Sequence, residues 1–245
     1  VYSIDGINVW ASGSEKLIKS TNSGINWLSM YPNSSGITFN NVIFVNKDTG
    51  FVTSSSNTFR TTDGGWDWNP QVTQINGKAI FFINSMTGYI CGAYGKISKT
   101  TNCGASWVLQ NSNVNTKLNS IYFANDNTGY AVGEYKTIIR TTNGGITWLG
   151  QSYSSSDFRL YSVFFTNPTT GYIAGYSIMG LSQILKTKDA GISWQSVNAP
   201  LTLGNYVNLF FLDDNTGFFT GGNALIKTVS AGEPIGINVI HSMEI

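Results

Sequence analysis

Few of the 245 residues carry side chains that could perform catalysis, and their positions decide which reactions are open. Hydrolysis of a glycosidic bond needs two carboxyl groups about 5 to 9.5 Å apart. The candidate carboxyls are Glu134, Asp157, Asp213 and Asp214. The last two precede a repeated Thr-Gly pair, as Asp48 and Asp126 do, which indicates turn positions rather than a catalytic pair.

The chain contains even fewer residues suited to other kinds of catalysis. The single histidine, His241, lies near the end of the chain, so neither a histidine-based triad nor a multi-histidine metal site is available. Cys91 and Cys103 share one repeat, but a hairpin would place Cys91 opposite about Ser98, which favours buried free thiols over a disulfide. Turns such as 125–127 lack the ligand spacing of an EF-hand. We therefore expect no catalytic residues, no metal site and no cofactor.

The composition narrows the range of partners. The net charge is +1 and only 11% of residues are charged, against about 25% in an ordinary domain. Without a basic surplus the chain has no general attraction for phosphates, so we expect no nucleic-acid binding. No apolar run reaches the ~20 residues that a membrane span needs. With 41% hydrophobic and 13% aromatic residues, the chain has enough apolar side chains to form a folded core rather than remain disordered.

The elements that must position these residues are repeated. A motif of the form Ser/Thr-x-Asp/Asn-x-Gly-x-x-Trp occurs five times, with Trp-to-Trp spacings of 41, 39, 41 and 46 residues. The copies are Ser20–Trp27, Thr61–Trp68, Thr100–Trp107, Thr141–Trp148 and Thr187–Trp194. A sixth copy around Gly232 has lost its Trp. A second motif, Thr-Gly followed by Phe or Tyr, keeps step with the first. A period near 41 indicates stacked supersecondary units.

Each repeat reads as four short strands. In the fourth repeat these are 119–124, 129–133, 137–141 and 147–151, all rich in β-branched and aromatic residues. No stretch shows helical periodicity. We therefore predict an all-β protein, a six-bladed β-propeller of four-stranded antiparallel blades spanning 1–232. The expected blades are about 1–33, 34–74, 75–113, 114–155, 156–200 and 201–240, and 233–245 is the last outer strand or a C-terminal linker.

The Trp motif has a structural role. Its Asp or Asn accepts backbone hydrogen bonds in an Asx-type turn, its Gly permits positive φ, and its Trp packs over the hairpin. The expected structural residues are Asn22, Trp27, Asp63, Trp68, Asn102, Trp107, Asn143, Trp148, Asp189 and Trp194.

These motifs resemble the Asp-box, or BNR, repeats of the photosystem II stability/assembly factor family and its bacterial relatives. The resemblance extends from Val1 to Gly232 and implies a β-propeller. The same Asp-box occurs in sialidases and some endoglucanases, where it lies away from the catalytic residues. Arg60 and Arg140 share one repeat position with Lys19, Lys99, Lys186 and Lys227, so they do not form the arginine cluster of a sialidase.

Recognition is expected on the face that carries the turns between second and third strands, because the Trp motifs occupy the other face. Loops on a rigid scaffold are the usual place for binding residues. The predicted binding residues are Tyr94, Glu134, Tyr135, Lys136, Arg159, Tyr176 and Met179. We predict a non-enzymatic binding or scaffolding module for a protein or glycan. The alternative is an Asp-box glycoside hydrolase of the sialidase or endoglucanase kind.

The C-terminal end raises two further expectations. Since the sixth repeat lacks its Trp, its outer strand must come from 235–240, from sequence upstream or from a neighbouring chain. An open ring would self-associate through an exposed strand edge. The segment 233–245 resembles the linker before a type IX secretion sorting domain, which implies a secreted or cell-surface bacterial protein.

Overall fold

The computed structural model describes residues 1–30, 36–151, 158–197, 206–221, 224–229 and 238–242. These residues form six four-stranded antiparallel sheets and one short 3-10 turn. The fold is therefore the predicted six-bladed β-propeller, with almost no helix. The chain divides into two compact units, Val1–Asn115 and Thr116–Ile245, and each holds three blades.

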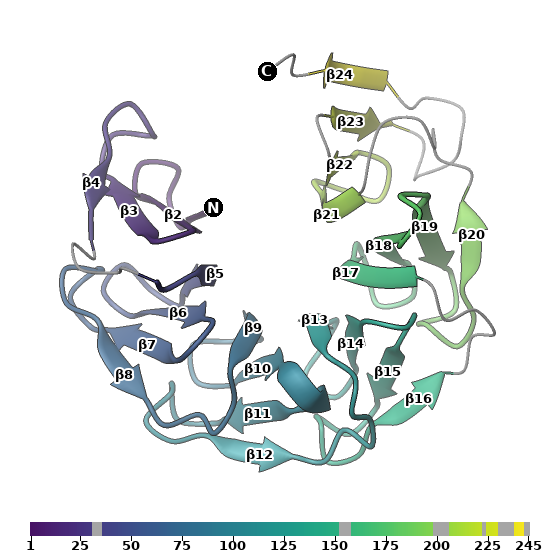
Figure 1. Cartoon of the computed structure of the whole chain (residues 1–245), viewed down its shortest axis with the longest axis horizontal. Helices are drawn as coiled ribbons and strands as arrows, with labels where there is room; N and C mark the ends of the chain where they lie inside the picture. The colour runs from purple at the N-terminus through teal and green to yellow at the C-terminus, as the bar shows by residue number, and fades with distance from the viewer. Residues whose placement is uncertain (31–35, 152–157, 198–205, 222–223, 230–237, 243–245) are drawn as a thin grey trace. The chain divides into compact units, whose positions relative to one another are not determined.

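Every blade is a simple meander of four consecutive strands (Figure 1). The first unit contains β1 (Tyr2–Ser3), β2 (Val9–Gly13), β3 (Lys16–Ser20) and β4 (Leu28–Ser29); β5 (Phe39–Phe44), β6 (Gly50–Ser54), β7 (Thr58–Thr61) and β8 (Asn69–Gln71); β9 (Gly77–Phe82), β10 (Gly88–Gly92), β11 (Ile97–Thr100) and β12 (Val108–Gln110). The second unit contains β13 (Leu118–Phe123), β14 (Gly129–Gly133), β15 (Ile138–Thr141) and β16 (Leu149–Gln151); β17 (Phe158–Phe165), β18 (Gly171–Ser177), β19 (Ser182–Thr187) and β20 (Gln195–Val197); β21 (Tyr206–Phe211), β22 (Gly217–Gly221), β23 (Ala224–Thr228) and β24 (Asn238–Ser242).

Neighbouring blades within a unit are joined by one repeated aromatic contact. The aromatic residue of a second strand packs on the last Phe of the next blade's first strand. Tyr130 stacks on Phe165 with ring centroids 4.1 Å apart, and Tyr172 stacks on Phe211 at the same distance. The glycine of the Thr-Gly pair makes room for this Phe, since a Cβ on Gly171 would lie 2.6 Å from the Phe165 ring.

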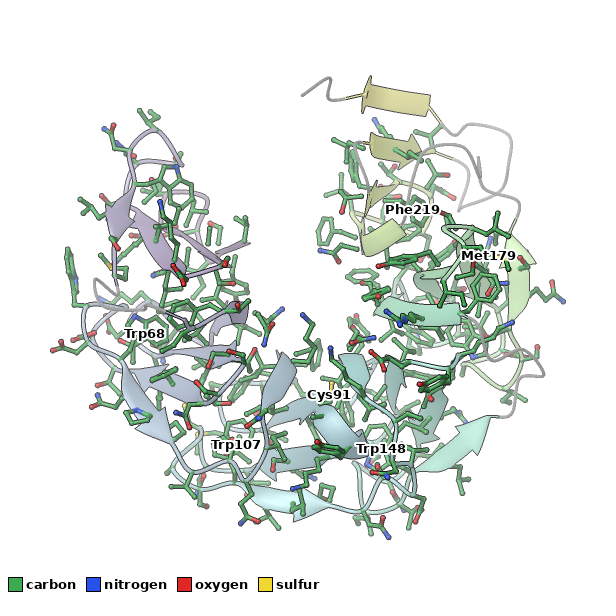
Figure 2. All side chains as sticks on the ribbon, in the orientation of Figure 1. Trp68, Cys91, Trp107, Trp148, Met179 and Phe219 are labelled. Atoms are coloured by element: carbon green, nitrogen blue, oxygen red, sulfur yellow. The ribbon has the colours of Figure 1, made fainter. Side chains whose placement is uncertain are left out.

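The Trp motifs form closed hydrogen-bonded turns. In the fifth blade the Thr187 hydroxyl donates to the Asp189 carboxylate over 2.7 Å, and the backbone N–H of Gly191 donates to Thr187 Oγ1 over 2.9 Å. The backbone N–H of Ser193 donates to the same carboxylate over 2.9 Å. Four of the five motif tryptophans, Trp68, Trp107, Trp148 and Trp194, are buried, whereas Trp27 is 39% exposed. The first three are labelled in Figure 2.

In four blades the basic residue before the Trp motif is a packing residue. Lys19, Lys99 and Lys186 place their ammonium groups 5.3 to 5.5 Å from the ring of the second-strand aromatic in their own blades. Arg60 lies 6.0 Å from the Phe51 ring in the same way. Such cation–π pairs stabilise a cation that has left bulk water, which gives the basic residue of these four repeats a structural role.

The sixth blade obtains its outer strand from the C-terminal part of the chain. β24 pairs antiparallel with β23, with Lys227 opposite Asn238 and Ala224 opposite Ser242. The remaining residues of the tail, 233–237 and 243–245, and the sixth copy of the motif around Gly232 lie outside the described residues.

The two cysteines are free thiols. Cys91 is buried in β10 and pairs with Ile97, one residue from the predicted partner Ser98. Burial raises the pKa of the Cys91 thiol to about 12. Cys103 is half-buried in the Trp motif of the same blade.

The fifth Trp motif predicts an acid-dependent contribution to stability. Hydrogen bonds from Ser193, and then from Thr187, lower the pKa of Asp189 to about 2, below the ~3.9 of an unfolded chain. A lowered folded-state pKa stabilises the protein above about pH 4, and that contribution is lost as the pH falls toward 2.

Asp189→Asn removes this titration while keeping the turn's acceptor, as Asn102 and Asn143 do in two other blades. We expect the variant's melting temperature, followed by circular dichroism, to fall less between pH 7 and pH 2.5 than that of the parent chain. An equal fall in both proteins would show that Asp189 carries no such linkage.

Candidate functional site

The predicted binding residues divide between the two units. Tyr94 belongs to the first unit and the other six belong to the second.

Tyr94 is presented by a tight turn. It lies in the 3-10 turn η1 (Ala93–Gly95) with a left-handed φ of 56° and is 72% exposed. The following residue must be glycine, because a Cβ on Gly95 would lie 2.0 Å from the carbonyl oxygen of Val114. Tyr94, Lys96 and Leu109 contribute to the lining of an open hollow of about 390 Å³. The turn therefore holds the Tyr94 ring in solvent beside a shallow depression.

The turn between β14 and β15 presents Tyr135 and Lys136. Both residues are left-handed, with φ of 53° and 54°, and Tyr135 is 66% exposed. The backbone N–H of Lys136 donates to the carbonyl of Phe158 in the next blade over 2.7 Å. The Lys136 ammonium lies 5.5 Å from the centre of the Phe158 ring. This turn is thereby attached to the start of β17.

Tyr176 lies in strand β18, which corrects the expectation that it belongs to the turn between the second and third strands of its blade. β18 continues to Ser177, with Tyr176 opposite Arg159 on one side and Ser182 on the other. The turn covers only 178–181 and is closed by the Ser177 N–H donating to the Leu181 carbonyl over 2.9 Å. The extra residues of the fifth repeat therefore lengthen the hairpin, and they give Tyr176 a fixed partner.

That partner is Tyr161, a residue absent from the predicted set. The two tyrosine rings stack with centroids 4.8 Å apart and an interplanar angle of 13°. Tyr161 is the extra residue of a β-bulge, since Leu160 pairs with Gly175 and Ser162 with Ala174. A bulge re-aims a side chain that regular alternation would send elsewhere. The sequence shows no sign of this bulge.

The charges around the stacked tyrosines form one network. A hydrogen bond with Tyr161, and then the negative charge of Glu134, contribute to raising the pKa of Arg159. Burial, and then a hydrogen bond with Tyr176, raise the pKa of Tyr161. Hydrogen-bonding and charge contacts therefore connect Glu134, Arg159, Tyr161 and Tyr176 across the fourth and fifth blades. We call these four residues, with Lys136 and Phe158, the Arg159 cluster.

Met179 lies at the tip of the same hairpin (Figure 2). It is 81% exposed, and its neighbours Ile178 and Leu181 are 66% and 51% exposed. The backbone N–H of Met179 donates to Ser177 Oγ over 3.3 Å. The hairpin therefore extends an apolar tip beyond the strand position that carries Tyr176.

The candidate catalytic carboxyls have structural roles where they are described. Asp213 accepts the backbone N–H groups of Thr216 and Asn215, and these bonds lower its pKa. Hydrogen bonds from Thr166 and Asn167 lower the pKa of Asp214. A general acid of a glycosidase needs the opposite shift. Glu134 belongs to the Arg159 cluster, and Asp157 lies outside the described residues.

Two further features bear on partners. Within the described parts of the chain, no three His, Cys, Asp or Glu side chains are grouped so that they could hold a metal ion. The same parts contain no helix that is long and apolar enough to cross a membrane.

Known proteins resemble this chain in sequence over part of its length. The family model described as photosynthesis system II assembly factor YCF48 matches residues 100–204. That segment contains the whole Arg159 cluster. No protein with a curated description matches the chain.

Solved structures resemble it over nearly its whole length. YCF48 bound to a D1 peptide superposes with a TM-score of 0.74 at 18% identity, covering 96% of this chain and 77% of the other. YCF48 from Cyanidioschyzon merolae gives 0.70 at 17% identity, covering 95% and 83%.

An ancestral GH74 enzyme gives a TM-score of 0.74 at 20% identity, covering 96% of this chain but only 36% of the enzyme. At identities of 17 to 20%, the similarity to these structures shows a shared fold and nothing more. Together with the partial family match and the five closed Trp motifs, it leads to one identification: the chain is a BNR-type β-propeller.

Proposed function

We propose that this propeller is a non-enzymatic module that binds a segment of a partner protein at the Arg159 cluster. The observation that carries the proposal is the stacked pair of Tyr161 and Tyr176 beside the exposed guanidinium of Arg159. Tyrosine and arginine are over-represented among the residues that dominate binding energy at protein interfaces. The export expected from the C-terminal tail belongs to the same proposal.

The surroundings of the stacked pair suit a polypeptide. Tyrosine offers a large amphipathic contact at a low cost in side-chain entropy. Arg159, Lys136 and Glu134 supply charges of both signs within the same cluster. The apolar side chains of such a segment would contact the tyrosine rings, and its charged side chains would pair with Arg159, Lys136 or Glu134.

The similarity to known proteins points in the same direction. The family model of the YCF48 assembly factor matches the region that contains the cluster. The superposed YCF48 structure was determined with a D1 peptide bound to that protein. The hydrolase alternative has less support, because Asp213 and Asp214 have lowered pKa values and are engaged in turns.

A peptide selection tests this proposal. A random twelve-residue peptide library is displayed on phage and selected on the immobilised chain, and enriched peptides are titrated by calorimetry. We expect enriched peptides to bind the parent chain and to lose at least about tenfold in affinity for Arg159→Ala.

The matched control is Arg60→Ala, which removes an arginine from the first unit. Its affinity for the same peptides should equal that of the parent chain. Failure to enrich any binding sequence, or equal affinity for the Arg159→Ala variant, would contradict the proposal. Turnover of fluorogenic glycosides by the parent chain would instead support the hydrolase.

A further inference from the structure

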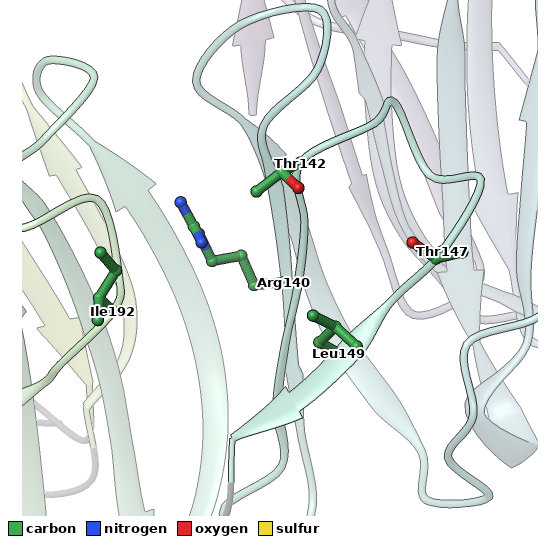
Figure 3. Close-up of a pocket in the computed structure, with 5 residues that line it drawn as sticks. All are labelled: Arg140, Thr142, Thr147, Leu149 and Ile192. Carbon is green, nitrogen blue, oxygen red and sulfur yellow. The ribbon is translucent and has the colours of Figure 1, made fainter.

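A cleft lies at the opposite end of β15 from the turn that carries Glu134 and Lys136. A cleft of about 230 Å³ is lined by Arg140, Thr142, Thr147, Leu149 and Ile192 (Figure 3). Arg140 and Leu149 belong to β15 and β16, and Thr142 and Thr147 belong to the Trp-motif turn between these strands. Ile192 belongs to the Trp motif of the next blade. Leu149 and Ile192 are 71% and 69% exposed, so two aliphatic side chains flank the opening.

Arg140 supplies the cation of this cleft. Its guanidinium extends toward Ile192 across the gap between the blades (Figure 3). Its Nε–H is buried and has no hydrogen-bond partner. The rest of the guanidinium hydrogen-bonds the Tyr130 hydroxyl, which donates in turn to the carbonyl of Ala190 in the neighbouring blade over 2.6 Å. Arg140 therefore keeps one unpaired N–H beside the cleft.

The first two blades contain a comparable arrangement, in which the Lys19 ammonium donates to the carbonyl of Gly64 in the next blade over 3.0 Å. Lys19 pairs across the strands with Leu28, as Arg140 pairs with Leu149. In the next blade Trp66 occupies the motif position that Ile192 occupies in the fifth. The Trp66 ring lies 5.4 Å from the Lys19 ammonium. The chain thus covers this cation with its own indole.

The fifth blade lacks that indole. Ile192 is smaller than tryptophan and has no π-face, and a cleft lies between it and the Arg140 guanidinium. Arginine stacks on aromatic faces more readily than lysine does. A cavity of about 150 Å³ is enough to hold benzene in another protein, so a cleft of 230 Å³ accommodates one aromatic ring.

We propose that the Arg140 cleft binds the aromatic side chain of a partner polypeptide, in the way that Trp66 covers Lys19. The ring would stack on the guanidinium and contact Leu149 and Ile192 with its edges. This site is separate from the Arg159 cluster, and the proposal does not depend on that cluster being the peptide-binding surface.

The test uses a pentapeptide with a central fluorotryptophan between glycines, followed by ¹⁹F NMR line broadening on the full chain. We expect the peptide to bind the parent chain, and a peptide with central leucine not to compete with it. Ile192→Trp installs the indole that the second blade carries, so it should fill the cleft and weaken binding at least about tenfold.

Two variants separate this effect from a general loss of structure. Ile146→Trp makes the same change at the matching position of the fourth blade, where the residue is 72% exposed, and should bind like the parent. Arg140→Lys keeps the charge without the planar group and should weaken binding severalfold. Equal competition by the leucine peptide, or undiminished binding to Ile192→Trp, would overturn the proposal.

Discussion

Trp148→Ala is expected to destabilise the chain by roughly 3 to 5 kcal/mol, the range for deleting a buried tryptophan side chain. Trp148 is fully buried and meets Phe123 edge-on with ring centroids 5.9 Å apart. Its removal leaves a cavity between the Trp motif and the first strand of the same blade. The melting temperature should fall by roughly 6 to 20 °C in a differential scanning experiment.

Trp27→Ala is the matched control, since it removes the same residue of the same motif in the first blade. Trp27 is 39% exposed, so less apolar surface returns to water and the loss should be clearly smaller. The comparison tests whether the Trp motifs stabilise through burial. Equal losses for the two variants would contradict that explanation.

Tyr176→Ala should weaken binding of a selected peptide about 30-fold, which corresponds to about 2 kcal/mol for a residue that dominates an interface. The substitution removes one ring of the stacked pair and the hydroxyl that contacts Tyr161. Tyr176 is half-buried at the end of β18, so the melting temperature should change by only a few degrees. Calorimetric titration measures the change in affinity, and thermal unfolding of the same samples measures the change in melting temperature.

Tyr94→Ala provides the control for this experiment. Tyr94 is 72% exposed on a turn of the first unit and takes no part in the Arg159 cluster. Its removal should leave the affinity unchanged. A loss for Tyr94→Ala as large as that for Tyr176→Ala would show that the peptide surface is not confined to the cluster.

The fold could be predicted from the sequence because each blade repeats the same local chemistry. In the fourth blade the second strand was predicted at 129–133 and is found there. The fourth strand was predicted from Thr147 but begins at Leu149. The difference arises because Thr147 still belongs to the hydrogen-bonded turn, where its backbone N–H donates to Asn143. A turn that contains β-branched and aromatic residues looks like a strand in the sequence.

The candidate site was predictable only in part. Glu134 and Arg159 lie in different repeats, and their charges interact because adjacent blades align their hairpin turns. Tyr161 was missed because a β-bulge, which leaves no pattern in the residue types, turns its ring toward Tyr176. The Arg140 cleft was also missed, since Ile192 occupies a motif position that is also isoleucine at Ile25 and Ile146, so the residue types give no sign of a cleft there.

Hydrogen–deuterium exchange of the chain with and without a selected peptide tests the central claim most directly. Binding at the Arg159 cluster predicts slower exchange in 133–137 and 158–162, with unchanged exchange in the η1 turn at 93–95. Undiminished exchange in both cluster segments at a saturating peptide concentration would contradict the assignment of recognition to this surface.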